Sequence, residues 1–197
     1  LLAAAGAGRA LTMTLHSPQV HGFFSVPVDH LHALRELAAH FAGDDLADTV
    51  VISPDLGNAK SAAAFSRLLD VPVAAGAKQR FSDDRVSISS IIGDVVDRDV
   101  IVLDDEIARG TTVLELLDRL REQKVRSIRI ACTHGLFAAG ALDRLAAEPD
   151  VQEIICTNTV PIPASKRVPK LRVLSVAPAF AEAIRRIHNG ESVSALF

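Results

Sequence analysis

Short apolar runs of strand length alternate along this chain with segments whose apolar residues recur at helical spacing. The clearest strand-like runs are Thr49–Ser53, Val100–Leu103, Ile128–Cys132, Ile154–Cys156 and Leu171–Leu174. Helical spacing occurs in between, at residues 59–69, 112–120 and 138–147. Strands that alternate with helices predict an α/β fold with a largely parallel, doubly wound sheet. Ligands of such sheets bind beyond the carboxyl ends of the strands, so functional residues are expected there.

Further segments complete the expected order of elements. Residues 10–14 and 71–73 are strand-like in composition, and residues 178–187 have helical spacing. Residues 28–41 carry apolar side chains at helical intervals, which predicts one helix over this range. The stretch from Gly76 to Ser90 is polar and lies between two strands, so a mobile loop or ribbon is expected there.

The composition narrows the class of protein. Of the 197 residues 49% are apolar and 23% are charged, and the formal net charge is −3, which is typical of a globular domain. The mildly acidic balance argues against a binder of nucleic acid or of anionic membranes, because both need a basic face. No apolar run approaches the roughly 18 to 20 residues of a spanning helix. Cys132 and Cys156 lie in apolar runs and are expected to be reduced core residues, which predicts a cytoplasmic location.

The strongest local signal is the stretch from Val102 to Thr112, in which a buried strand leads through two acids and a turn into a helix. Backbone N–H groups at a helix N-terminus suit a phosphate dianion, and a glycine lets the backbone approach it closely. The adjacent carboxylates of Asp104 and Asp105 suit the vicinal hydroxyls of a sugar. The stretch therefore favours a grip for ribose 5-phosphate. The alternative is an ordinary capped helix with Thr111 or Thr112 as its N-cap.

This stretch also resembles the ribose-phosphate binding motif of the type I phosphoribosyltransferase fold. Other segments narrow the resemblance to the ribose-phosphate pyrophosphokinase family, and they follow that family's order over essentially the whole chain. They are Leu15–Asp29, Ser53–Asn58, Lys78–Arg80, Ile91–Val95, Thr133–Gly135, Ala181–His188 and Glu191–Phe197. The resemblance implies an α/β, parallel-sheet type I phosphoribosyltransferase-like domain plus part of a second similar domain.

The resemblance further implies a Mg²⁺-dependent transfer of the diphosphoryl group of ATP to the anomeric hydroxyl of ribose 5-phosphate, giving phosphoribosyl pyrophosphate and AMP. Lys78 and Arg80 match the catalytic basic pair on the family's flexible loop. His16 and Asp55 match residues that the family uses around the Mg²⁺–nucleotide. By themselves, His16 is typical of a structural histidine and Asp55 of a turn former. The ribose 5-phosphate site would use Asp104, Asp105, Ala108, Arg109, Gly110, Thr111 and Thr112.

The family's architecture divides the chain into three parts. Residues 1–29 would be the remnant of an N-terminal synthetase domain, and residues 30–170 the phosphoribosyltransferase-like C-terminal domain. Residues 171–197 would be a strand and a helix that pack back on the N-terminal domain. Family members are longer, hold most of their ATP-binding residues in an N-terminal region, and form homo-oligomers (dimers or hexamers). This chain by itself is therefore expected to bind ribose 5-phosphate but to be a poor or inactive synthetase.

The chain departs from the family's pattern at several positions, among them Ala77, where an acid usually precedes the catalytic lysine, and the loosely matching residues 58–61. Thr14 stands where the family usually has an aspartate, and Arg109 enters a phosphate loop that loses a glycine and an early hydroxyl. These departures favour an alternative function, a non-catalytic regulatory or partner subunit of a synthetase complex. The presence of both Lys78 and Arg80 favours the enzyme instead. A third hypothesis is a phosphoribosyltransferase that consumes the diphosphate, and the Leu15–Asp29 segment argues against it.

Overall fold

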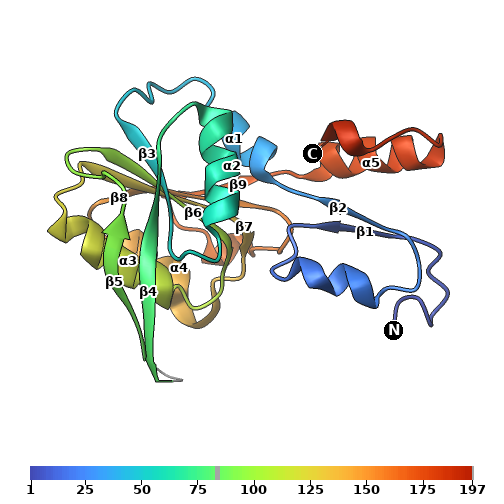
Figure 1. The fold of residues 1–197 in the computed structure, drawn as a ribbon, viewed down its shortest axis with the longest axis horizontal. Coiled ribbons are helices and arrows are strands. Elements are labelled where there is room, and N and C mark those ends of the chain that lie inside the picture. Colours follow the sequence, from blue (N-terminus) through green and yellow to red (C-terminus); the bar gives the residue numbers. More distant parts are fainter. Residues whose placement is uncertain (83–84, 197) are drawn as a thin grey trace. The chain divides into compact units, whose positions relative to one another are not determined.

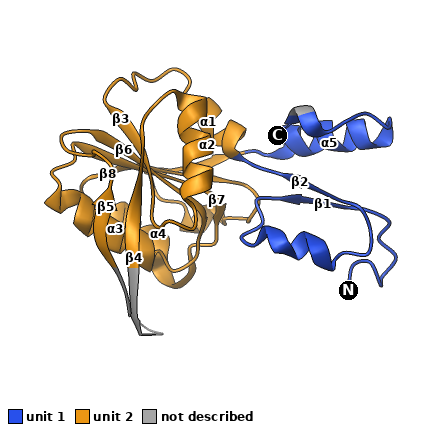
Figure 2. Cartoon of the chain, in the orientation of Figure 1, with its two compact units in different colours: residues 1–33, 175–197 blue, residues 34–174 orange. Residues whose placement is uncertain are grey.

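The chain forms two compact units, which Figure 2 shows in different colours. The structure is a computed structural model that describes residues 1–82 and 85–196, and within these ranges all side chains except those of residues 79–87 and 195. Unit 1 comprises Leu1–Ala33 and Ser175–Phe197, and unit 2 comprises Leu34–Leu174. Each unit has a hydrophobic core of its own.

A seven-stranded sheet forms the centre of unit 2 (Figure 1). Its strands are β3 (Thr49–Ser53), β4 (Val73–Ser82), β5 (Arg85–Ile92), β6 (Asp99–Ile107), β7 (Ser127–Gly135), β8 (Val151–Thr157) and β9 (Leu171–Leu174). Their spatial order is β5-β4-β3-β6-β7-β8-β9. All neighbouring strands are parallel except β4 and β5, which are antiparallel. The predicted α/β fold with a largely parallel sheet is confirmed.

Helices cover both faces of this sheet. They are α1 (Leu34–His40), α2 (Ala59–Leu69), α3 (Thr111–Glu122) and α4 (Ala141–Ala147). Along β6, Val100 and Val102 pack with residues of α3 and α4, whereas Ile101 and Leu103 pack with residues of α1 and α2. This alternation is the two-residue period of a strand buried on both faces. No helix within the described ranges is long and apolar enough to cross a membrane.

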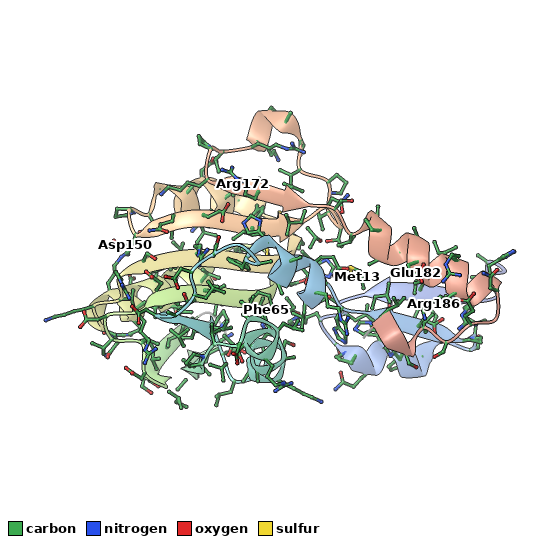
Figure 3. All side chains as sticks on the ribbon, turned by 90° about the horizontal axis from the view of Figure 1, so that it is seen from above. Met13, Phe65, Asp150, Arg172, Glu182 and Arg186 are labelled. Atoms are coloured by element: carbon green, nitrogen blue, oxygen red, sulfur yellow. The ribbon has the colours of Figure 1, made fainter. Side chains whose placement is uncertain are left out.

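An aromatic pair connects α2 with the end of α1. Phe65 of α2, labelled in Figure 3, and Phe41 have ring centroids 6.1 Å apart and planes inclined by 79°. Both side chains are fully buried, and the guanidinium of Arg129 lies 4.7 Å from the centroid of the Phe41 ring. Such contacts add roughly 0.5–1 kcal/mol each beyond the area that they bury. They fix the helix whose N-terminal end carries part of the site described below.

The predicted helix over residues 28–41 is wrong in its first part. Val28–Leu31 form strand β2, which pairs in parallel with β1 (Ala10–Met13), and α1 begins only at Leu34. Pairing outweighs local helical spacing here because it satisfies the backbone hydrogen bonds of two segments at once. The apolar residues of this range also serve different cores, since Leu31 packs within unit 1 and Leu37 within unit 2.

The boundary between the two units lies after Leu174, whereas the family resemblance predicts it before residue 171. Strand β9 pairs with β8 in the sheet of unit 2, and only the residues from Ser175 onward belong to unit 1. Strand β9 joins this sheet because it provides parallel partners for the backbone groups of β8 from Ile154 to Thr157, which would otherwise form an open edge. The assignment of residues 1–29 to the remnant of a synthetase domain stays a prediction.

The polar stretch from Gly76 to Ser90 forms a ribbon, one of the two forms predicted for it. Its arms are β4 and β5, which pair from Ala75 opposite Ile92 to Ser82 opposite Arg85. Residues 83 and 84 lie outside the described residues. Lys78 is carried by the first arm of this ribbon, in β4.

Helix α5 (Ala177–His188) packs on the two-stranded sheet of unit 1. Its buried residue Ala183 shares a core with Met13 of β1 and Leu31 of β2. On the exposed side, Glu182 accepts hydrogen bonds from the guanidinium groups of Arg185 and Arg186, at 2.7 to 2.8 Å. Glu182 and Arg186 are labelled in Figure 3. The amphipathic helix thus closes unit 1 from one side.

The two cysteines are buried free thiols, as expected from the sequence. Cys132 of β7 and Cys156 of β8 are direct neighbours in the parallel pairing of these strands. Burial raises the pKa of the Cys132 thiol well above its ordinary value and that of Cys156 to about 11. Because the thiolate is the reactive form, both side chains act as core residues.

Three histidines of unit 1 pack edge to face. The ring centroid of His30 lies 4.7 Å from that of His21 and 4.5 Å from that of His32. The Nδ1 atom of His30 shares a hydrogen bond with Thr12 Oγ1 at 3.0 Å, and its Nε2 atom is buried without a hydrogen-bond partner. Burial, followed by the proximity of His32 and His21, lowers the pKa of His30 to about 4.

This cluster is expected to make the chain less stable as the pH falls from about 6.5 towards about 4. The folded state keeps His30 neutral, so in this window the unfolded chain binds more protons. Because the ring is only partly buried, we expect a loss of about 1 kcal/mol in the free energy of unfolding. Urea unfolding at pH 7 and pH 4.5 should show that His30→Asn reduces this loss, whereas His188→Asn, at an exposed site on α5, leaves it unchanged. An equal pH dependence in both variants would contradict the expectation.

Candidate active site at the carboxyl ends of the central strands

The acidic pair lies where β6 extends beyond its neighbour β3. The pairing of β3 with β6 ends at Ile52 opposite Val102, whereas β6 continues to Ile107 through its pairing with β7. The strand therefore ends four residues later than predicted, and Asp104 and Asp105 lie within its carboxyl-terminal part. This is the edge of a parallel sheet at which ligands bind.

Asp55 organises the turn that follows β3. Its Oδ1 atom accepts a hydrogen bond from the backbone N–H of Asn58 at 3.2 Å, which closes the turn before α2. A Cβ atom at Gly57 would lie 3.1 Å from the same oxygen, so the turn leaves little room for a side chain there. Asp55 is thus the turn former that its residue type indicates, and its Oδ2 atom remains available to other groups.

Lys78 provides the contact to that second oxygen. Its Nζ atom lies 3.4 Å from Asp55 Oδ2, and the two side chains are 22% and 32% exposed. Gly76 makes this approach possible, because an added Cβ would lie 2.4 Å from the carbonyl oxygen of Pro54. The strand that carries Lys78 can therefore pass closely over the turn that carries Asp55.

Asn58 links this turn to the acidic pair. Its Nδ2 atom donates to the carbonyl oxygen of Leu103 at 3.1 Å and to Asp104 Oδ1 at 3.5 Å. The sequence motif that contains Asn58 contributes to the family resemblance, but the sequence does not single out its side chain. Only the fold shows that an amide at the start of α2 reaches the neighbouring strand.

The carboxyl of Asp104 has an unusual proton affinity. Burial, a hydrogen bond with the Asp105 side chain and the negative charges of Asp105 and Asp55 raise its pKa to about 8. The backbone N–H of Asp105 donates to Asp104 Oδ1 at 3.0 Å, and this hydrogen bond lowers the pKa of Asp104. The site therefore concentrates negative charge that a cation or a hydrogen-bond donor would stabilise.

A short loop leads from β6 into α3, and we call Ile107–Gly110 the cradle loop. Gly110 is the N-cap of α3, with a left-handed φ of 70°, and has no side chain to cap the helix. The alternative prediction, with Thr111 or Thr112 as the N-cap, is therefore wrong, because both residues lie inside the helix. A Cβ atom at Gly110 would also approach that of Ala141 to 3.4 Å. The first-turn N–H groups of α3 have no partner within the helix, which suits an anion.

A further polar network lies at the carboxyl ends of β7 and β8. Thr157 Oγ1 donates to the carbonyl oxygen of Thr133 at 2.8 Å, and Thr159 Oγ1 does so at 3.1 Å. His134 Nδ1 lies 2.9 Å from Thr159 Oγ1. These bonds hold the strand ends next to β6 in a fixed arrangement.

The structure brings together most of the residues that the sequence singles out in unit 2. Asp55, Lys78 and Asp104 are connected through the contacts above, and Asp105 and the residues from Ala108 to Thr112 follow along the same strand, loop and helix. The backbone of Arg80 lies in β4, but its side chain is outside those that the structure describes. His16 belongs to unit 1 and Asp55 to unit 2, so their joint metal site stays a prediction.

The sheet order, the acids at the end of β6 and the helix that follows define a type I phosphoribosyltransferase-like fold. The chain belongs to the phosphoribosyl synthetase-associated domain family, which matches residues 58–197. The crystal structure of phosphoribosylpyrophosphate synthetase from Mycobacterium smegmatis has a TM-score of 0.85 and 38% sequence identity to this chain. The match includes 96% of the residues of this chain and 61% of those of the mycobacterial chain.

Curated relatives match the chain over its whole length. A Streptomyces coelicolor protein, provisionally named a ribose-phosphate pyrophosphokinase, is 77% identical over 197 residues. The ribose-phosphate pyrophosphokinase of Deinococcus radiodurans is 46% identical over 202 aligned residues. The chain spans 62% of the length of the first relative and 63% of the second. These similarities confirm the resemblance inferred from the sequence motifs.

Proposed function

We propose that the chain forms part of a ribose-phosphate pyrophosphokinase that acts on ATP and ribose 5-phosphate. In the reaction, the anomeric oxygen of the sugar attacks the β-phosphorus of ATP and loses its proton. The bond between the β-phosphorus and the oxygen bridging to the α-phosphorus breaks, and AMP leaves. The observation that carries the proposal is the connected set of Lys78, Asp55, Asn58 and Asp104 beside a helix N-terminus.

The sugar phosphate would be held by two adjoining groups of residues. Asp104 and Asp105 would bind the vicinal hydroxyls, as their position at the end of β6 supports. Ala108, Arg109, Gly110, Thr111 and Thr112 would bind the 5-phosphate through the cradle loop and the first turn of α3. Arg109 is exposed and could add a charge-assisted contact to the phosphate.

Lys78 and Arg80 would act on the phosphates of ATP. Both residues belong to β4 and lie two residues apart. Positive charge held there would meet the charge that develops on the transferring diphosphoryl group, which needs positioning and electrostatic stabilisation more than covalent help. Asp55 would keep Lys78 in place until the substrates bind.

Magnesium fits the chemistry of this site. Burial, together with the neighbouring carboxylates of Asp105 and Asp55, raises the pKa of Asp104. Carboxylate oxygens such as those of Asp55 are the donors that Mg²⁺ prefers. A site for Mg²⁺ commonly consists of one or two carboxylates completed by substrate phosphates and water. His16 and Asp55 are the proposed protein groups, and the ion would supply neutralisation of phosphate charge.

The wider setting follows from the same proposal. The buried free thiols of Cys132 and Cys156 and the names of the relatives support a cytoplasmic, nucleotide-forming enzyme. A homo-oligomer, dimeric or hexameric, is proposed from the family resemblance alone.

A second candidate is a non-catalytic regulatory or partner subunit, and the environment of Thr14 favours it. Thr14 is buried, has a left-handed φ of 44°, and its Oγ1 atom accepts a hydrogen bond from the backbone N–H of Ala33 at 3.2 Å. A threonine hydroxyl fixed in this way replaces the carboxylate that the family resemblance implies at this position. Such a subunit would bind ribose 5-phosphate without transferring the diphosphoryl group.

Asp104→Ala is expected to weaken the binding of ribose 5-phosphate to the chain by about 1–3 kcal/mol, the range for hydrogen bonds to charged groups. Isothermal titration calorimetry at pH 8.5 would measure the dissociation constant, with Asp143→Ala, at an exposed site on α4, as the matched control. Unchanged affinity in Asp104→Ala would count against the sugar grip. Binding without AMP release, in a chain extended to the length of the relatives, would favour the partner subunit.

A further inference from the structure

Three successive carbonyl groups of the cradle loop are held by one neighbouring segment. The carbonyl oxygen of Ile107 accepts from the backbone N–H of Phe137 at 3.0 Å, and that of Ala108 accepts from Ala138 at 2.9 Å. The carbonyl oxygen of Arg109 accepts from the guanidinium Nη2 atom of Arg144 at 2.7 Å. The segment from Phe137 to Arg144 thus binds every peptide carbonyl from Ile107 to Arg109.

This arrangement determines where the N–H groups of the loop point. In a planar trans peptide the N–H of one residue is antiparallel to the carbonyl of the residue before it. With the three carbonyls bound by the segment, the N–H groups of Ala108, Arg109 and Gly110 are directed away from it. Successive N–H groups on one side of a bent backbone form an anion-binding concavity, which continues here into the first turn of α3.

The segment itself is held in an unfavourable conformation. Phe137 and Ala139 have left-handed φ values of 45° and 52°, although neither is a glycine. Such a backbone conformation is unfavourable for a residue with a Cβ atom and persists only where its surroundings impose it. The ring of Phe137 packs against the core beneath α3, and a Cβ atom at Gly135 would lie 2.5 Å from it. The chain therefore maintains a strained segment beside the cradle loop.

We propose that Arg144 is a positioning residue for the phosphate of ribose 5-phosphate. This inference rests on the proposed function and adds a residue that touches neither the sugar nor the phosphate. The bonds from Phe137 and Ala138 are made by the backbone, whereas the bond to Arg109 depends on one side chain. Without Arg144, the peptide between Arg109 and Gly110 is free to turn its carbonyl oxygen towards the anion, which opposes binding.

The test compares variants at Arg144 with a matched arginine elsewhere. Arg144→Met keeps the length and apolar stem of the side chain but removes the donor, and should raise the dissociation constant for ribose 5-phosphate about tenfold in calorimetry. Arg144→Lys retains one donor and should recover most of the affinity. Arg172→Met is the control, because Arg172 also donates from an exposed site to a backbone carbonyl, that of Pro169 at 3.0 Å.

A second readout separates positioning from general destabilisation. In ¹⁵N spectra of the ligand-free chain, Arg144→Met should shift the amide resonances of Ala108 to Gly110, and Arg172→Met should leave them in place. Urea unfolding should show similar midpoints for the two methionine variants.

The outcomes distinguish this inference from the proposed function. Wild-type affinity in Arg144→Met, or unmoved amide resonances of the cradle loop, would overturn the positioning role and leave the proposed function intact. Failure of the unaltered chain to bind ribose 5-phosphate would overturn the proposed function, and with it the phosphate role of Arg144. If Arg144→Met does not fold, Arg144→Lys provides the test. The positioning role requires that Arg144→Lys shifts the amide resonances of the cradle loop and keeps a near-native affinity for ribose 5-phosphate.

Discussion

Lys78→Ala is expected to lower kcat and kcat/KM of the proposed diphosphoryl transfer together, by about 100-fold or more. Lys78 lies 3.4 Å from Asp55 and is partly exposed, so it is held in place but remains accessible to substrate. Its charge would act mainly on the negative charge that develops during transfer, and alanine provides no substitute. The measurement is AMP release from Mg²⁺-ATP and ribose 5-phosphate, in a chain extended at its N-terminus to the length of the relatives.

Lys166→Ala provides the matched control, because Lys166 is an exposed lysine of unit 2 in a short 3-10 helix, Ala164–Lys166. It should retain the unaltered rate. The affinity for ribose 5-phosphate, measured by calorimetry, should be the same in both lysine variants. A higher KM with an intact kcat in Lys78→Ala would instead identify Lys78 as a residue that binds substrate in the ground state.

Asp104→Asn is expected to stabilise the ligand-free chain at pH 8 by about 2–3 kcal/mol, a value that allows for screening by nearby water. The pKa of Asp104 is about 8 in the folded state, compared with an ordinary value of 3.8. Between these two values the folded chain keeps a proton that the unfolded chain releases. The contribution of Asp104 to the free energy of unfolding is therefore fully present below pH 4 and is lost as the pH rises towards 8. Asparagine does not titrate, so the variant avoids this loss.

Urea unfolding in the presence of EDTA, at pH 4.5 and pH 8, would measure the effect. The gain in Asp104→Asn should be larger at pH 8 than at pH 4.5, and Asp143→Asn on α4 should show no such difference. A loss of stability at pH 8, or a gain that does not depend on pH, would show that Asp104 ionises freely in the folded chain. The same substitution should weaken sugar binding, because the stabilising change removes a functional carboxylate.

The order of elements in unit 2 could be predicted because it depends on local patterns. The β-branched run Thr49–Ser53 and the apolar run Val100–Leu103 are buried on both faces, and such strands need little tertiary information to be recognised. The helix expected over residues 28–41 failed for the opposite reason. Val28–Leu31 become a strand only because β1, which ends fifteen residues before Val28, provides the pairing partner.

The candidate site was predictable where it follows a continuous stretch of sequence. Asp104, Asp105 and the residues from Ala108 to Thr112 form one strand, loop and helix, so their proximity is set by the chain itself. Asn58 and Arg144 could not be found in this way. Their polar groups reach the site across 46 and 35 residues of sequence, through hydrogen bonds that only the packed sheet makes possible.

Gly76 makes the β4–β5 ribbon sensitive to substitutions that alter no polar or charged side chain. Its missing side chain lets β4 pass over Pro54, and the same passage sets the distance between Lys78 and Asp55. A methyl group at this position would displace the ribbon from the turn without removing any polar or charged group. The resulting loss of the contact between Lys78 and Asp55 would resemble the loss of a catalytic side chain, although Gly76 has no side chain. Substitutions that suit the strand would therefore abolish the proposed transfer by changing the distance between Lys78 and Asp55 alone.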